Sequence, residues 1–246
     1  MAAWRLIKTP KLSGLTNMQT DLKMFHDFEA GLISSTLRIY SWKPKCISYG
    51  YAQKVDRLIA LRQSSGQGGS EAQKRDWDIV KRPTGGGIVF HNEAEVTYSL
   101  ITELDNPKLP KGLVPSYKKL SEAIVHALNL FNINSELKPT QEPANPPTRN
   151  SLCFSYPAEY EVVVDGRKIV GSAQKRGKRT LLQQGSIFVR NTSEDDFSLL
   201  KQPNQAYNAV SVEEVLGRTV GFEELYEALV VGFCETLKIE LKTQKL

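Results

Sequence analysis

Short apolar segments recur along the chain, and several alternate apolar and polar positions with the period of two that is typical of half-buried strands. The segments predicted as strands are residues 37–42, 46–51 and 97–101. Two further runs, 159–164 and 167–171, flank the dipeptide Asp165-Gly166. An Asp-Gly pair accommodates the positive φ angles of a two-residue turn, so these two runs are predicted to form a β-hairpin.

Helical spacing of apolar residues appears in two longer segments. Residues 117–131 place apolar side chains on one helical face, with Ser116 predicted as the N-cap. Residues 222–237 form a second amphipathic helix, and a shorter helix before it begins with the capping box of Ser211 and Glu214. Strands and helices do not alternate strictly. We therefore predict an α+β fold, with a mixed or antiparallel central sheet flanked by helices.

The length of 246 residues fits one domain that spans residues 1–246. Within it, residues 64–76 are rich in Gly, Ser and Gln and are predicted to form an exposed loop insertion. Residues 139–150 hold four prolines, which exclude a helix or a central strand and indicate a connector.

The composition narrows the class of protein. A hydrophobic fraction of 40% with 24% charged residues is that of a folded globular chain. No segment approaches the roughly 20 apolar residues of a membrane span, and no secretory signal begins the chain, so a cytoplasmic protein without a membrane partner is expected. The net charge of +5 favours an acidic partner. No nucleic-acid-binding motif accompanies the charge, so the protein is not expected to bind nucleic acid.

Three cysteines and three histidines are scattered along the chain. Their spacing matches neither a disulfide framework nor a metal site, so reduced thiols and no bound metal are expected.

A cluster of three glycines is the first segment with chemical content: Arg82-Pro-Thr84-Gly85-Gly86-Gly87-Ile-Val-Phe-His91. Adjacent glycines let a ligand approach the backbone, and Arg82 and His91 add a cation and a polar ring. The segment is neither a Walker A loop nor a dinucleotide fingerprint. A plain glycine turn between two strands is the alternative interpretation.

Cys153 is a candidate nucleophile because it follows the proline-rich connector, at the end of a loop, where functional groups concentrate. A thiol of ordinary pKa needs a nearby cation or base to react at neutral pH. Lys168, on the far arm of the predicted hairpin, could supply that cation. The simpler alternatives are an inert thiol and an exposed, solvated strand lysine. Further cations at 175–179 look like a basic turn that could dock an acidic partner.

Taken together, these segments resemble the biotin/lipoyl attachment superfamily (lipoate–protein ligases A and B), and within it the LipM-type octanoyl-[acyl carrier protein]:protein N-octanoyltransferases. Most of the matching segments are short, and it is their shared order and spacing that make the resemblance specific. They are Trp4-Arg5-Leu6, Asn17-Met18, 37–42, 48–51, 80–86, Thr97-Tyr98-Ser99, Cys153-Phe154, Pro157, Tyr160-Glu161, 166–174 and Gly185-Ser186-Ile187.

The resemblance implies a biotin/lipoyl ligase-like catalytic domain that moves octanoyl from acyl carrier protein to a lysine of a lipoyl domain, in a glycine cleavage H protein or a 2-oxoacid dehydrogenase E2 subunit. Cys153 would carry the acyl group as a thioester, and Lys168 would contact its carbonyl. The residues that would bind the acyl chain are Arg82, Thr84, Gly85, Gly86, Gly87, His91, Gly171, Ser172, Ala173, Gln174, Gly185 and Ser186. No cofactor would be required.

Three departures from the family pattern are visible. Gln184 stands where a histidine is usual, Gly87 stands where octanoyltransferases commonly have arginine, and residues 64–76 look inserted. The chain ends at Leu246, soon after the last helix, so the accessory domain of many ligases is expected to be absent.

Other interpretations of the same segments stay open. An ATP- and magnesium-dependent lipoate–protein ligase shares the glycine segment and the lysine, and an amidotransferase would move the acyl group between two lipoyl domains. A non-catalytic protein that binds an acyl carrier is the alternative outside enzymes, although the presence of both Cys153 and Lys168 argues against it.

Overall fold

The computed structural model describes residues 3–54, 77–138, 160–193, 196, 199 and 208–246. The predicted loop insertion at 64–76, the connector at 139–150 and Cys153 lie outside these residues.

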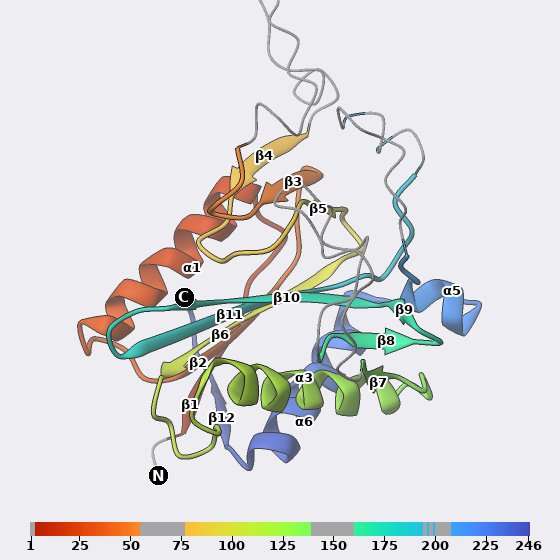
Figure 1. Cartoon of the computed structure of the whole chain (residues 1–246). Coiled ribbons are helices and arrows are strands. Elements are labelled where there is room, and N and C mark those ends of the chain that lie inside the picture. The colour runs from red at the N-terminus through yellow and green to blue at the C-terminus, as the bar shows by residue number, and fades with distance from the viewer. Residues whose placement is uncertain (1–2, 55–76, 139–159, 194–195, 197–198, 200–207) are drawn as a thin grey trace, which may run out of the picture.

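A six-stranded mixed sheet forms the centre of the molecule, in the order β10-β11-β6-β2-β1-β12 (Figure 1). Its strands are β1 (Trp4–Lys8), β2 (Thr36–Tyr40), β6 (Val96–Glu103), β10 (Val170–Arg176), β11 (Thr180–Ile187) and β12 (Leu241–Thr243). Strand β1 pairs in parallel with β2 and β12, and the other neighbours in this sheet are antiparallel.

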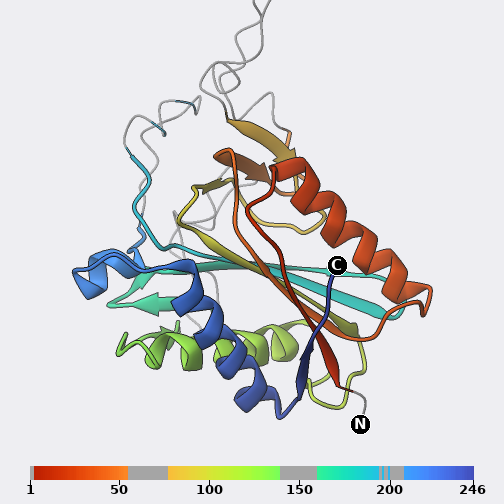
Figure 2. The same cartoon turned by 180° about the vertical axis from the view of Figure 1, so that it is seen from behind.

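Helices cover both faces of this sheet. Helices α3 (Leu113–Asn129) and α6 (Phe222–Leu237) lie on one face and α1 (Gly14–Glu29) lies on the other (Figures 1 and 2). The alternation along β6 explains this arrangement: Tyr98 and Leu100 join the core beneath α3 and α6, whereas Ile101 packs with Phe25 of α1. An antiparallel strand in the middle of the sheet is therefore buried on both faces.

Two small sheets complete the fold. One has the order β4-β3-β5 and consists of β3 (Cys46–Tyr49), β4 (Asp78–Lys81) and β5 (Val89–His91). The other consists of β7 (Glu136–Leu137), β8 (Val162–Val164) and β9 (Arg167–Lys168), near the short helix α5 (Val212–Leu216). The small sheet of β3, β4 and β5 lies beside one end of α1 (Figure 1).

The predicted α+β fold with a mixed central sheet is confirmed, and so is the β8–β9 hairpin. Its turn residues Asp165 and Gly166 have φ of 49° and 73°, the left-handed conformation that an Asp-Gly turn accommodates. The helix predicted at 222–237 has those bounds.

Ser116 as the N-cap of the preceding helix is wrong. Helix α3 begins at Leu113 with Gly112 as its N-cap, and the Ser116 hydroxyl donates to the Leu113 carbonyl inside the first turn. Pro115 is compatible with that turn because the N–H that proline lacks has no helical partner there.

The predicted capping box of α5 is half present. The Ser211 hydroxyl accepts a hydrogen bond from the Glu214 amide, as expected, but the Glu214 carboxylate pairs with Arg167. Among the helices that the structure describes, none is both long and apolar enough to cross a membrane.

Candidate functional site

A narrow cavity of about 30 Å³ lies where the small sheet of β3, β4 and β5 meets the central sheet. Its exposed surface is almost entirely apolar. The residues that line it are Met18, Tyr40, Trp42, Arg82, Thr84, Val89, His91, Thr97, Gly171, Ser172, Ala173, Gln184, Gly185 and Ser186. Segments that are far apart in sequence thus share one cavity.

Most of the residues predicted to bind an acyl chain are brought together here: Arg82, Thr84, His91, Gly171, Ser172, Ala173, Gly185 and Ser186. Gln174 lines a neighbouring surface groove instead. Gly85, Gly86 and Gly87 are not among the lining residues, because the chain at Arg82 and Thr84 presents side chains to the cavity and the three glycines continue past it.

Arg82 holds the glycine segment in place. Its guanidinium donates to the carbonyl oxygens of Gly85 and Gly87 at 3.0 and 2.6 Å, and to the Ser48 hydroxyl at 2.7 Å. Between these carbonyls Gly86 has φ of 87°, a conformation that favours glycine. The cation predicted to face a ligand is therefore engaged with the loop that contains it.

A buried chain of polar groups continues from Arg82 through β3 and β5. The Ser48 Oγ lies 2.5 Å from His91 Nε2, and His91 Nδ1 lies 2.5 Å from a carboxylate oxygen of Glu95. The same carboxylate accepts hydrogen bonds from Thr97 and Ser186. The His91 ring also stacks on Trp42, with 3.9 Å between the ring centroids. The imidazole is thus fixed on both nitrogens and on one face.

Gln184 joins the other end of the cavity wall to helix α1. Its amide nitrogen donates to Asp21 at 2.7 Å, and its amide oxygen accepts from the Thr84 hydroxyl at 2.7 Å. Asp21 is buried, and its other donors are Arg38, Tyr40 and Ser99. The glutamine that replaces the usual family histidine therefore connects α1, β11 and the glycine segment.

Gly185 is required by close packing between β11 and β6. A Cβ atom at this position would lie 2.2 Å from the ring of Tyr98. Burial raises the pKa of Tyr98, whose hydroxyl accepts from Gln183 and contacts Ser172 of the cavity wall. The absence of a side chain at 185 therefore leaves room for the tyrosine ring.

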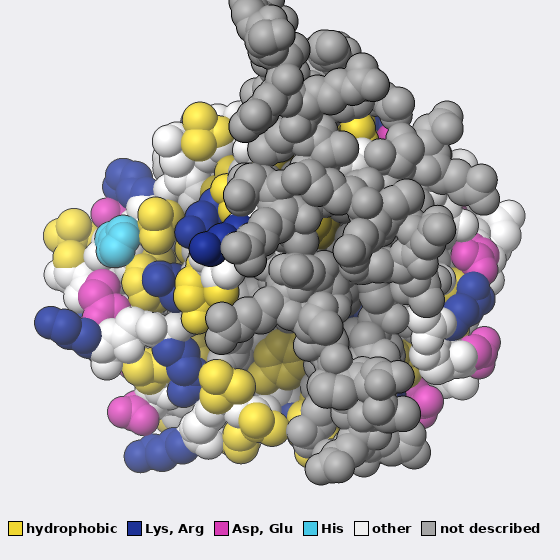
Figure 3. Space-filling view, turned by 45° about the horizontal axis from the view of Figure 1, so that its top comes forward, with side chains coloured by type: hydrophobic (Ala, Val, Ile, Leu, Met, Phe, Trp, Pro, Cys, Tyr) yellow, Lys and Arg dark blue, Asp and Glu magenta, His cyan; other side chains and the backbone are white. Residues whose placement is uncertain are grey.

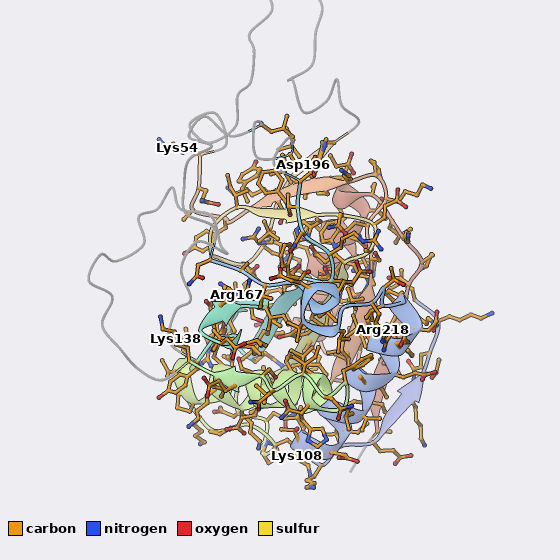
Figure 4. All side chains as sticks on the ribbon, turned by 90° about the vertical axis from the view of Figure 1, so that its right-hand side faces the viewer. Lys54, Lys108, Lys138, Arg167, Asp196 and Arg218 are labelled. Atoms are coloured by element: carbon orange, nitrogen blue, oxygen red, sulfur yellow. The ribbon has the colours of Figure 1, made fainter. Side chains whose placement is uncertain are left out.

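Lys168 is not an exposed strand lysine, which corrects that interpretation of the sequence. Only 1% of the residue is exposed, and its ammonium lies 2.6 Å from the Glu161 carboxylate, which is also buried. The short β9 explains the burial: the Lys168 amide and carbonyl pair with the chain at 208–210, which covers the strand. The neighbouring Arg167 points the other way, toward α5 (Figure 4).

Two cysteines of the described chain pack as the sequence predicts. Cys46 is buried within β3, and burial raises the pKa of its thiol well above the usual range. Burial also raises the pKa of Cys234 in α6. Burial thereby disfavours the thiolate form of both residues, although Cys234 is only partly buried. Cys153 lies outside the described residues.

Sequence reasoning missed several residues of the cavity and its surroundings, chiefly Ser48, Glu95 and Asp21. The pattern His91-x-x-x-Glu95 was a usable signal, since a carboxylate so near a histidine often orients its ring. Asp21 gave none, because its partners come from three distant strands, β2, β6 and β11. Among the described residues, no group of three or more His, Cys, Asp or Glu side chains could hold a metal ion.

Comparisons with known proteins agree with this geometry. The family model of the lipoyl protein ligase A/B catalytic domain matches residues 13–234. Octanoyltransferase LipM of Brevibacillus brevis is 34% identical over 261 residues, which cover 100% of this chain and 91% of that protein. Octanoyltransferase LipM of Geobacillus kaustophilus is 36% identical, covering 99% and 89% of the two chains.

Solved structures share the fold. A putative lipoate protein ligase from T. acidophilum with bound lipoic acid superimposes with a TM-score of 0.77 at 20% identity, covering 100% of this chain and 90% of that one. Lipoate-protein ligase A bound with ATP gives a TM-score of 0.77 at 22% identity, with the same coverage.

Proposed function

Because the chain belongs to the lipoyl protein ligase A/B catalytic domain family, we propose that it is an octanoyltransferase of protein lipoylation. It takes octanoyl from a thioester on acyl carrier protein and joins it to a lysine of a lipoyl domain. The relatives at 34% and 36% identity over nearly the whole chain bear the name of this activity.

The observation that carries the proposal is that the cavity has an apolar surface, although many of the residues that line it are polar. The polar atoms of Arg82, His91 and Gln184 form hydrogen bonds with protein groups around the cavity, as described above. Carbon atoms are therefore left facing the cavity. Such a surface suits a saturated acyl chain, and each methylene that the chain buries contributes roughly 0.8 kcal/mol. A charged or hydrogen-bonding ligand finds few free groups there.

The first half-reaction assigns Cys153 as the nucleophile. Its thiolate attacks the carbonyl carbon of the donor thioester, the new carbon–sulfur bond forms, and the carrier leaves as a thiolate that takes up a proton. The octanoyl group is then held on Cys153 as a thioester of similar energy, so the exchange needs no further activation.

The second half-reaction transfers the acyl group to nitrogen. A lysine of the lipoyl domain loses its ammonium proton, attacks the Cys153 thioester and forms an amide as the carbon–sulfur bond breaks. An acceptor lysine has an ordinary pKa near 10.4, so deprotonation is part of the barrier at neutral pH. The nitrogen releases a second proton to solvent as the amide forms, and the Cys153 thiolate is regenerated.

Lys168 is assigned to the carbonyl oxygen of the acyl group. Its ammonium is held by Glu161 at 2.6 Å, which fixes its position in a buried setting. A fixed cation in such a setting stabilises the negative charge that develops on a carbonyl oxygen under attack. Glu161 thus acts through Lys168 as a positioning residue.

The donor thioester supplies the activation energy, so transfer proceeds without ATP or magnesium. ATP-dependent lipoate ligation is the second candidate, because ligases with bound lipoic acid or ATP share the fold. Amidotransfer between two lipoyl domains would use the same thioester with a different donor.

Intact-mass analysis tests the proposal directly. Protein incubated with octanoyl-acyl carrier protein, without ATP, gains the mass of one octanoyl group, and hydroxylamine removes it. Cys153→Ala gains none and loses overall transfer by at least about a thousandfold, as expected when a covalent nucleophile is removed.

The matched controls are the other two thiols. Cys46→Ala and Cys234→Ala acquire the octanoyl mass at the wild-type rate, because Cys46 is buried and neither residue lines the cavity. Attachment of free lipoate only when ATP is added, with an inert thioester donor, would instead establish the ligase. A Cys153→Ala protein of full activity would remove the thioester from the mechanism.

A further inference from the structure

A surface groove of about 700 Å³ lies beside the acyl cavity, between α1, the glycine segment and the end of β10. Met18 and Arg82 line both the groove and the cavity, so the two spaces adjoin. Whatever occupies the groove lies next to the acyl chain.

Exposed apolar side chains form one side of the groove. Leu15 and Leu22 are spaced seven residues apart on α1, which places them on the same helical face, and they are 59% and 37% exposed. Tyr51, which is 62% exposed, lies across from them. Met24 and Phe25, on the adjoining buried face of α1, pack against the sheet. Helix α1 therefore carries a second apolar stripe that the core does not use, as expected of a binding surface.

The charged side chains of the groove are all basic. They come from Lys81, Arg82, Lys175 and Arg176, and none of the described residues that line it is Asp or Glu. The Arg176 guanidinium donates hydrogen bonds to the Gly112 carbonyl and the Ser116 hydroxyl, at the start of α3. Figure 3 shows apolar and basic side chains gathered together on the side of the molecule that α1 occupies.

The basic turn predicted from the sequence divides at Gly177. Lys175 and Arg176 line the groove, whereas Lys178 and Arg179 turn away and donate their backbone N–H groups to Glu29. Only the first half of the turn belongs to the surface beside the cavity.

We propose that this groove docks the acyl donor: an acidic carrier domain that presents an apolar ridge between carboxylates and carries its acyl chain on a phosphodiester-linked arm. The proposal rests on the octanoyltransferase function above. The phosphodiester and the carboxylates match the groove's cations, and the ridge covers Leu15, Leu22 and Tyr51.

Charge distinguishes the donor from the acceptor. A lipoyl domain brings a lysine ammonium, which a groove lined by four cations repels. The donor brings the octanoyl chain itself, and the groove adjoins the cavity that receives it. Both features assign the groove to the first half-reaction.

Steady-state kinetics with two donors tests the assignment. The variants are Lys81→Glu/Lys175→Glu, which reverses groove charge, and Leu15→Ser/Leu22→Ser, which removes the apolar stripe. The donors are octanoyl-acyl carrier protein and octanoyl-pantetheine, which lacks both the domain and the phosphodiester. The matched control is Lys108→Glu/Lys242→Glu, with Lys108 at the opposite end of the molecule from the small sheet (Figure 4).

The charge reversal raises KM for octanoyl-acyl carrier protein by about tenfold or more at low salt, with kcat unchanged, and the increase shrinks as salt rises. The apolar variant raises the same KM at every salt concentration. KM for octanoyl-pantetheine and for the lipoyl domain stays at the wild-type value, and the control behaves as wild type throughout.

The opposing results are distinct from one another. An unchanged KM for the carrier in both groove variants overturns the docking proposal, and so does an increase confined to the lipoyl domain, which would make the groove the acceptor's surface. Failure of both donors to acylate wild-type protein would refute the octanoyltransferase function itself.

Discussion

Lys168 and Glu161 illustrate how one residue can serve stability and chemistry together. The two charges lie 2.6 Å apart, with 1% and 5% of the residues exposed. Removing one member of a buried pair leaves the other charge in a medium that solvates it poorly, and typically costs about 3–5 kcal/mol. Loss of activity on substituting Lys168 could therefore arise from unfolding alone.

We expect Lys168→Ala to lower the free energy of unfolding by about 3–5 kcal/mol, measured by urea denaturation. Lys168→Met/Glu161→Leu, which removes both charges and keeps apolar volume, recovers most of that stability yet does not form the octanoyl-enzyme. Arg167→Gln, on the same strand but partly exposed, costs less than about 1 kcal/mol. Octanoyl transfer by the stable double variant would show that the ammonium is dispensable.

For single residues, local features could be predicted from the sequence, whereas contacts with distant segments could not. The hairpin turn at Asp165-Gly166 was predictable because its signal is local. The burial of Lys168 was not, because the chain that covers it follows some forty residues later, at 208–210. The hydrogen bonds that turn Arg82 and Gln184 away from the cavity are likewise made by residues from distant segments.

At the scale of elements, Gln184 is the connection between β11, α1 and the glycine segment. It receives a hydrogen bond from Thr84 and gives one to Asp21, both at 2.7 Å. The neighbouring Gln183 points to the other face of the sheet and bonds to Tyr98. The two glutamines have the same chemistry, but only one reaches the wall of the cavity.

A double-mutant cycle should detect this connection. Gln184→Ala and Thr84→Val are expected to be non-additive in unfolding free energy, with a coupling of about 1 kcal/mol, because each substitution breaks the same hydrogen bond. Gln183→Ala with Thr84→Val serves as the matched cycle and should be additive. Additive energies in the first cycle would mean that the 84–184 hydrogen bond contributes nothing to the fold.

Elements with a strong local pattern were predicted well, and others were not. Helix α6 and the strands β2, β3 and β6 have uninterrupted apolar patterns. Helix α1 escaped prediction because the face that it buries is mixed: Met24 and Phe25 pack against the sheet, while Asn17 and Asp21 enter a polar network. A helix whose buried face is partly polar lacks the usual apolar period.

For the whole molecule, several carboxylates make folding sensitive to acid. A hydrogen bond from Arg190 is the main cause that lowers the pKa of Glu213, and one from Arg167 lowers that of Glu214. The unfolded chain, with carboxylates at their ordinary pKa near 4.5, then binds more protons than the folded protein at lower pH. Their stabilisation is complete above that pKa and is lost as pH falls through the lowered values.

The expected consequence concerns Arg190→Gln. At pH 7 it lowers the free energy of unfolding by up to about 1 kcal/mol, since the Arg190–Glu213 pair is partly exposed. Below pH 4.5 the difference between variant and wild type shrinks as Glu213 becomes protonated in both. Urea denaturation at pH 7 and at pH 3 measures the difference in unfolding free energy between Arg190→Gln and the wild type. A difference that persists at pH 3 would mean that the arginine side chain stabilises the fold through its packing and not through its charge.

The parallel pairing of β1 with β12 has a consequence for the order in which the protein can be assembled during its synthesis. Strand β1 is synthesised before either of its neighbours in the sheet, β2 and β12, and β12 begins only at Leu241. One side of β1 therefore stays unpaired until β12 has been synthesised. Contacts of such wide separation slow folding and leave a sheet edge open to other chains meanwhile. We expect chaperones that shield exposed strands to bind this edge of the nascent chain.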